Sequence, residues 1–253
     1  MSTFLELAQE CRALSGIGGT GPVSVTTATG IEARIVNYVK NAWIDIQTHP
    51  KSWKWQWRRY EASAGVPLQT ILNTREYTLT GVQGIRVRSL RSYLTATGTS
   101  DRQRMGWVPW QKFEDRYSIT NESADRPIQV TREPTGDLKF YPKPDAAYSI
   151  EFEYFKTAQI LAANDDVPEM PTDYHQLIIY EALKRFGKAE DAPEIIRLGE
   201  EAAGSDGNEG RPVSGLWRAL IWAEEFKDAD LENENVQMVV RTQQRSSGMN
   251  SNY

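Results

Sequence analysis

The hydrophobic residues of this 253-residue chain change their spacing twice, and this change constrains the fold more than any other feature. From residue 31 to 46 they recur every three to four positions, which is the period of an amphipathic helix. From Trp53 to about residue 156 they tend to alternate with polar residues, which is the period of half-buried strands. Helical spacing returns after "NDDVPEMP" at 164–171. The sequence therefore predicts an α+β protein in which a β-rich segment interrupts a helical one.

Helices are expected wherever apolar residues keep the helical period. In the first of these helices Thr3 or Ser2 is a plausible N-cap and Gly16 a stop. Pro171 and Asp173 suit the start of a later helix, for which Gly187 is a possible stop. The expected helices cover residues 4–14, 31–46, 171–187, 191–203 and 214–231.

Strands are expected where polar and apolar residues alternate between turn residues. The last three of them are predicted to form an antiparallel meander. In it Ile150, Phe152 and Tyr154 face one way, and Glu151 and Glu153 the other. Residues 95–104, "TATGTSDRQR", are predicted to be a polar, mobile loop. The expected strands cover residues 75–82, 84–90, 127–133, 137–143 and 148–156.

This order of elements predicts three parts. Residues 1–51 and 157–231 form a helical bundle, and residues 52–156 form an inserted antiparallel β-rich domain. Residues 232–253 are rich in Asn, Gln and Ser apart from "VQMVVR" at 236–241, so they are expected to be an extended tail.

The stretch "SWKWQWRRYE" at 52–61 permits two interpretations. Aromatic and basic residues together are typical of a groove for single-stranded nucleic acid. Strand alternation, however, would place Trp53, Trp55 and Trp57 on one face, and Lys54, Gln56 and Arg58 on the opposite one. This opposition favours tryptophans that pack at a domain or subunit interface over tryptophans that stack on bases.

Charge is unevenly distributed along the chain. Residues 51–150 carry 16 basic and 10 acidic side chains, a net charge of +6, whereas residues 151–253 carry 10 basic and 20 acidic ones, a net charge of −10. The whole chain has a net charge of −5, while a protein that binds free nucleic acid is usually basic. The two regions are therefore expected to face different neighbours.

Neither a signal peptide nor a membrane span is expected, because acidic residues interrupt the N-terminal apolar positions and all apolar runs are short. Cys11 is the only cysteine, so no intrachain disulfide is possible. It falls on the apolar side of its predicted helix, as a buried core or interface thiol does.

No catalytic, metal or cofactor site is predicted. "GIGGTG" at 16–21 fits a phosphate-binding pattern by letters, but a helix precedes it and Pro22 follows, so a plain loop is favoured. His49 and His175 lack the partners of a metal motif. The acidic run "NDDVPEMPTDYH" at 164–175 does not have the spacing of a calcium loop, and solvated acids explain it.

Two long segments resemble the head-to-tail adaptor (tail connector) proteins of tailed bacteriophages. The first is "GIEARIVNYVKNAWIDIQTHPKSWKW" at 30–55, in which the "NAWIDIQ" helix precedes the tryptophan-rich stretch. The second, at 138–192, contains the turn "FYPKPD" and the helix start "VPEMPTDYHQLIIYEAL". The resemblance covers roughly residues 3–190, whereas residues 204–253 match nothing in the pattern.

The resemblance implies a structural protein of the virion, made in the host bacterial cytoplasm, without enzymatic activity or cofactor. Such adaptors form a homo-oligomeric ring, commonly a dodecamer, that binds the portal protein and meets tail or nozzle proteins. Packaged DNA passes through the lumen without specific binding. The tail, with its centre Val236, Gln237, Met238, Val239, Val240 and Arg241, is the implied portal-docking segment.

Two alternatives stay open at this point. The first is a nucleic-acid-binding module of the β-rich block, with phosphate contacts from Arg86, Arg88, Arg91, Arg102 and Arg104. The second is an enzyme with a cation bound near Asp165 and Asp166. The structural interpretation is favoured over both.

Overall fold

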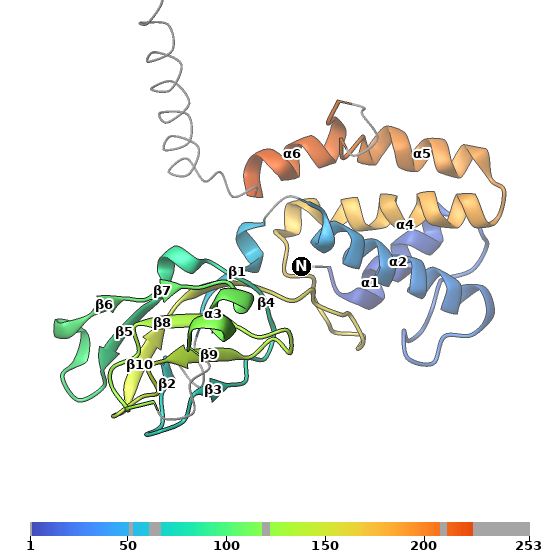
Figure 1. Ribbon diagram of the computed structural model, residues 1–253. Coiled ribbons are helices and arrows are strands. Elements are labelled where there is room, and N and C mark those ends of the chain that lie inside the picture. Colours follow the sequence, from blue (N-terminus) through green and yellow to red (C-terminus); the bar gives the residue numbers. More distant parts are fainter. Residues whose placement is uncertain (1, 51–52, 61–66, 118–121, 208–211, 225–253) are drawn as a thin grey trace, which may run out of the picture. The chain divides into compact units, whose positions relative to one another are not determined.

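The computed structural model describes residues 2–50, 53–60, 67–117, 122–207 and 212–224. They fall into two compact units. A helical unit lies within residues 1–54, 162–167 and 171–253, and a β-rich unit within residues 55–161 and 168–170. The predicted α+β class is confirmed, since helices and several largely antiparallel sheets are both present (Figure 1).

The helical unit consists of α1 (Phe4–Leu14), α2 (Gly30–Thr48), α4 (His175–Ala189), α5 (Pro193–Ala203) and α6 (Gly215–Glu224). α1 starts with a capping box, in which Thr3 and Glu6 each bind the other's backbone N–H. Most of the apolar residues predicted to line these helices form the core, and Trp43 joins them. The core includes Leu7, Cys11, Ile35, Val39, Trp43, Ile46, Leu177, Ile178, Leu183 and Phe186. Hydrophobic spacing thus located these helices correctly.

Gly187 does not end its helix, contrary to the prediction, because α4 continues to Ala189. Its role is to let α4 and α5 approach closely. A Cβ at this position would lie 2.8 Å from Ile196 Cγ1 and 2.9 Å from the Ile196 nitrogen. α4 itself starts at His175, after the 3-10 helix η4 (Thr172–Tyr174) that follows Pro171.

The β-rich unit contains three small sheets (Figure 1). Their strand orders are β1-β11-β4, β2-β10-β5-β6 and β3-β9-β8-β7, and all pairs are antiparallel except β7 with β8. Leu90, Met105, Val130, Leu138, Phe140, Ile150 and Phe152 form their common core. The strands are β1 (Trp57–Arg59), β2 (Leu68–Gln69), β3 (Glu76–Tyr77), β4 (Val82–Ile85), β5 (Arg91–Leu94), β6 (Gln103–Arg104), β7 (Gly106–Trp107), β8 (Gln129–Arg132), β9 (Leu138–Tyr141), β10 (Tyr148–Glu151) and β11 (Glu153–Lys156).

The predicted three-stranded meander is only half right. β8 and β9 form the expected hairpin, but β10 pairs with β2 and β5 in a different sheet, and β11 pairs with β1 and β4. The chain changes sheets at Phe152, so Glu151 is buried instead of facing solvent. Alternation predicts which face a side chain occupies, but it does not select the partner strand.

Residues 95–104 are not simply a loop, because they contain the 3-10 helix η3 (Gly98–Asp101) and strand β6. Two bonds of Asp101 hold them: Asp101 Oδ1 accepts from the Leu94 backbone N–H at 3.1 Å, and Asp101 Oδ2 accepts from Arg126 Nη1 at 2.9 Å. The sequence also did not predict α3 (Trp110–Tyr117) or η2 (Val87–Ser89). Within the described ranges, no helix combines the length and the apolar character needed to cross a membrane.

Candidate interaction surfaces

The tryptophan-rich stretch is a strand only in its second half. Residues 54–56 form the 3-10 helix η1 (Lys54–Gln56), and β1 starts at Trp57. A 3-10 helix turns each residue by about 120°, so the predicted alternation fails here. Trp55 and Gln56 are neighbours in sequence and both are buried.

The three tryptophan rings lie in different surroundings. Trp53 is fully buried in the helical unit, where its indole Nε1 donates to the Ile46 carbonyl at 2.8 Å. Trp55 is buried and Trp57 half-buried in the β-rich unit, and the Arg86 guanidinium lies 5.0 Å from the Trp57 ring centroid. Buried rings cannot stack on bases, so Trp53 and Trp55 are not a nucleic-acid platform. Their role at a domain or subunit interface stays a prediction.

Two of the five arginines proposed as phosphate contacts lie on two adjacent strands, whereas Arg88 lies in η2 and Arg102 directly precedes β6. Arg91 on β5 and Arg104 on β6 are directly opposite each other. Arg102 Nη2 lies 2.6 Å from Glu151 Oε2, and Arg91 Nη1 donates to the Arg88 carbonyl at 2.7 Å. Arg86 is separate from them, since its Nη1 lies 3.4 Å from Glu153 Oε2.

Glu151 is the buried carboxylate of this region. It lies opposite Arg91 in the β10–β5 register, and it forms ion pairs with both Arg59 and Arg102. We define the arginine cluster as Arg59, Arg88, Arg91, Arg102 and Arg104. The sequence could not reveal this arrangement, because Glu151 lies far from every one of these arginines along the chain.

A hollow of about 500 Å³ lies beside the arginine cluster. Two cationic residues, Arg88 and Arg104, contribute to its lining. The other lining residues are Gly106 and the apolar residues Val87, Met105 and Trp107. We call it the apolar hollow. Its combination of apolar walls and cations fits a partner that presents an aliphatic side chain beside carboxylates.

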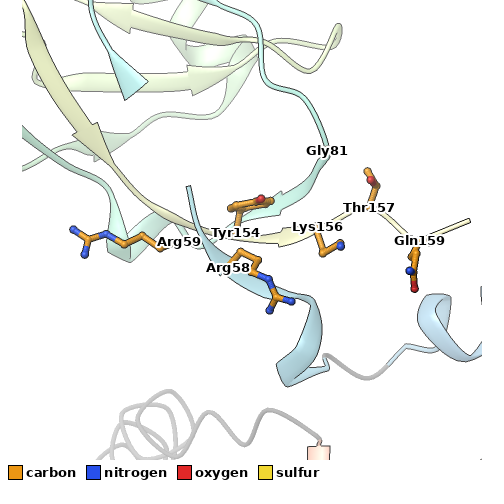
Figure 2. A pocket seen from close by; sticks show the side chains of 8 residues that line it. Arg58, Arg59, Gly81, Tyr154, Lys156, Thr157 and Gln159 are labelled. Carbon is orange, nitrogen blue, oxygen red and sulfur yellow. The ribbon is translucent and has the colours of Figure 1, made fainter. Parts of the chain in front are cut away.

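A second hollow, of about 540 Å³, is lined by residues of the paired strands β1 and β11 and of the segment that follows β11 (Figure 2). Figure 2 shows Arg58 and Arg59 diverging from β1, while Tyr154 and Lys156 extend from β11. Two of its three cations have acidic partners, since Arg59 pairs with Glu151 and Lys156 with Glu169. The hollow is therefore less positive than its lining suggests.

The described residues contain no candidate metal centre. None of them form a group of three or more His, Cys, Asp or Glu side chains that could hold a metal ion. In the acidic run, Asp166 Oδ2 accepts backbone N–H bonds from Ala162 and Ala163, at 2.6 and 2.7 Å, and these bonds lower the pKa of the Asp166 carboxyl. Asn164 Oδ1 accepts from the Val25 N–H at 2.8 Å. These two side chains therefore shape the loop.

The remaining motifs also have structural roles. α1 precedes the "GIGGTG" loop directly, and the Arg12 guanidinium donates to the Gly18 carbonyl inside that loop. A phosphate-binding loop would follow a strand instead. His49 is buried between the rings of Trp53 and Trp217, at centroid distances of 5.7 and 5.1 Å, and His175 is buried at the start of α4. The predicted portal-docking residues 236–241 lie outside the described residues.

The arginine cluster and the two hollows are the kind of surface that binds other macromolecules, so the fold and these surfaces indicate a binding or assembly protein. Comparison with family models identifies the class more closely: residues 2–237 match the SU10 adaptor protein family. The chain belongs to this family, which is a family of phage head-to-tail adaptors, and the resemblance seen in the sequence is confirmed. A comparison with curated proteins finds no match. The protein is thus a structural, head-tail connector component of a bacteriophage.

Proposed function

We propose that this adaptor assembles as a homo-oligomeric ring of twelve copies that joins the portal protein to the tail. DNA passes through the lumen of the ring without specific binding. The observation that carries the proposal is the family match over residues 2–237. A closed ring needs two different complementary faces on each copy.

The proposal is tested by mixing the purified full chain with portal rings of the same phage. The particles are measured by native mass spectrometry and electron cryomicroscopy. We expect a closed ring of adaptor copies on one end of the portal. Failure to bind the portal, or binding without ring closure, contradicts the proposal. A monomer in the absence of the portal does not, since the portal can act as the assembly template.

We further propose that residues 232–253 dock on the portal, with Val236–Arg241 as the central contact. An apolar segment of this kind can add a strand to a partner sheet. Deletion of residues 232–253 should therefore abolish attachment to the portal in a co-sedimentation assay. The circular dichroism spectrum and the melting temperature of the shortened chain control for its fold. Attachment of the folded, shortened chain would refute the docking role.

A further inference from the structure

The arginine cluster contains two cations whose charge Glu151 does not neutralise. Glu151 forms its ion pairs with Arg59 and Arg102. Arg91 and Arg104 face each other across β5 and β6, and like charges in this position repel each other. The structure gives Arg91 and Arg104 no carboxylate partner among the described residues. An acidic partner from outside would relieve this repulsion.

The apolar hollow adds a second requirement for that partner. Val87 is partly exposed, and with Met105 and Trp107 it forms walls that a phosphate group cannot complement. An aliphatic side chain would fill this space and remove apolar area from water. β6, which carries Arg104, is the edge strand of its sheet and is exposed, so an approaching surface can reach the hollow.

The outer face of α5 has both properties. Glu194, Leu198 and Glu201 are spaced by four and three residues, so they lie along one side of the helix. Leu198 is 40% exposed, between the two glutamates. Arg197 pairs with Glu201 at 3.2 Å, and the exposed charges on this side of the helix, Glu194, Arg197 and Glu201, sum to −1.

We propose that the outer face of α5 in one copy binds the apolar hollow of the next copy. Leu198 enters the hollow, and Glu194 and Glu201 pair with Arg88 and Arg104. The contact is heterologous, because each copy contributes one face to each of its two neighbours, as closure of a ring demands. This inference rests on the proposed ring and names the surfaces that hold it together.

Charge reversal tests the contact on the full chain with portal rings. Arg88→Glu with Arg104→Glu should lower ring assembly roughly a hundredfold, since like charges then face each other. Glu194→Arg with Glu201→Arg should have the same effect. The chain that carries all four substitutions should recover ring assembly. Lys112→Glu with Arg116→Glu is the matched control, because both side chains are exposed on α3 of the same unit, and it should leave assembly unchanged.

A cysteine pair tests the same contact directly. One population carries Cys11→Ser and Val87→Cys, and the other carries Cys11→Ser and Leu198→Cys. On the portal, oxidation of the mixture should link the two populations. A mixture in which Ile71→Cys replaces Val87→Cys should not link, although Ile71 is exposed in the same unit.

The outcomes separate the two proposals. If wild-type protein forms the ring and both charge-reversal variants still assemble like it, the α5 contact is overturned and the ring proposal stands. The same holds if no link forms between the Val87→Cys population and the Leu198→Cys population. Wild-type protein that forms no ring on the portal overturns both. Loss of DNA binding without loss of assembly in the Arg88→Glu, Arg104→Glu chain assigns the arginines to nucleic acid and overturns the contact. The circular dichroism spectrum of each variant must match that of the wild type.

Discussion

The thiol of Cys11 is fully buried on α1, and burial raises its pKa to about 12. The thiolate is the reactive form of cysteine, so we expect the native protein to resist Ellman's reagent at pH 8. The same reagent should react at once after unfolding in urea, measured by absorbance. Since Cys11 is the only cysteine, the signal is unambiguous. Rapid reaction of the native chain would show that the thiol is accessible.

The raised pKa of Cys11 also predicts how stability depends on pH. The unfolded thiol ionises near its ordinary pKa of 9.0, whereas the native thiol keeps its proton to about pH 12. The unfolded state therefore loses a proton first, and the free energy of unfolding falls as pH rises between these values. Urea titrations at pH 8 and pH 10 check this. Cys11→Ala should show a smaller decrease than the wild type.

Trp53 is the best buried of the three tryptophans in its stretch. Trp53→Ala removes a large ring and leaves the Ile46 carbonyl without its indole donor, so we expect a loss of about 3–5 kcal/mol in the free energy of unfolding. Urea denaturation followed by far-ultraviolet circular dichroism measures it. Trp222→Ala is the control, because this ring is 67% exposed, and it should cost less than about 1 kcal/mol. Equal losses in the two variants would contradict the prediction.

At the scale of elements, the close approach of α4 and α5 depends on glycine at two crossing points. Gly187 faces Ile196, and a Cβ at Gly199 would lie 2.9 Å from the Tyr180 carbonyl oxygen. Both glycines lie inside helices, where alanine is intrinsically the better residue. Packing between the helices therefore outweighs the helix propensity of either residue.

Gly187→Ala should accordingly destabilise the helical unit. Steric overlap with the Ile196 backbone costs about 1–3 kcal/mol, against a gain in helix propensity of about 1 kcal/mol. The melting temperature measured by circular dichroism should fall. Gly18→Ala is the matched control, since nothing lies within 4 Å of its added methyl group and its φ is ordinary. An increase in melting temperature for Gly187→Ala would refute the close contact.

At the scale of the whole molecule, the net charge of −5 opposes binding to free DNA. We expect the full chain to bind duplex DNA no better than ordinary non-specific binding, with a dissociation constant above about 10 µM at physiological salt. Fluorescence anisotropy with a labelled duplex measures it from 50 to 200 mM salt. A tight complex that weakens by roughly 10³-fold or more over this range would instead support the nucleic-acid-binding alternative.

Hydrophobic period and turn chemistry by themselves determined the α+β class, the places of the main helices and the β8–β9 hairpin. They also placed Cys11 in the core. These properties are local, because they depend on residues a few positions apart.

The tertiary structure alone decided which strands pair, and therefore where the surfaces lie. It turned residues 54–56 into a 3-10 helix, moved β10 into a sheet with β5, and buried Glu151 beside Arg59 and Arg102. Alternation leaves the partner strand open. The ion pairs of Glu151 join residues that are 49 and 92 positions apart, and hydrophobic spacing cannot predict such pairs. For this reason the sequence suggested a basic block, whereas the fold arranged it into an arginine cluster with an apolar hollow beside it.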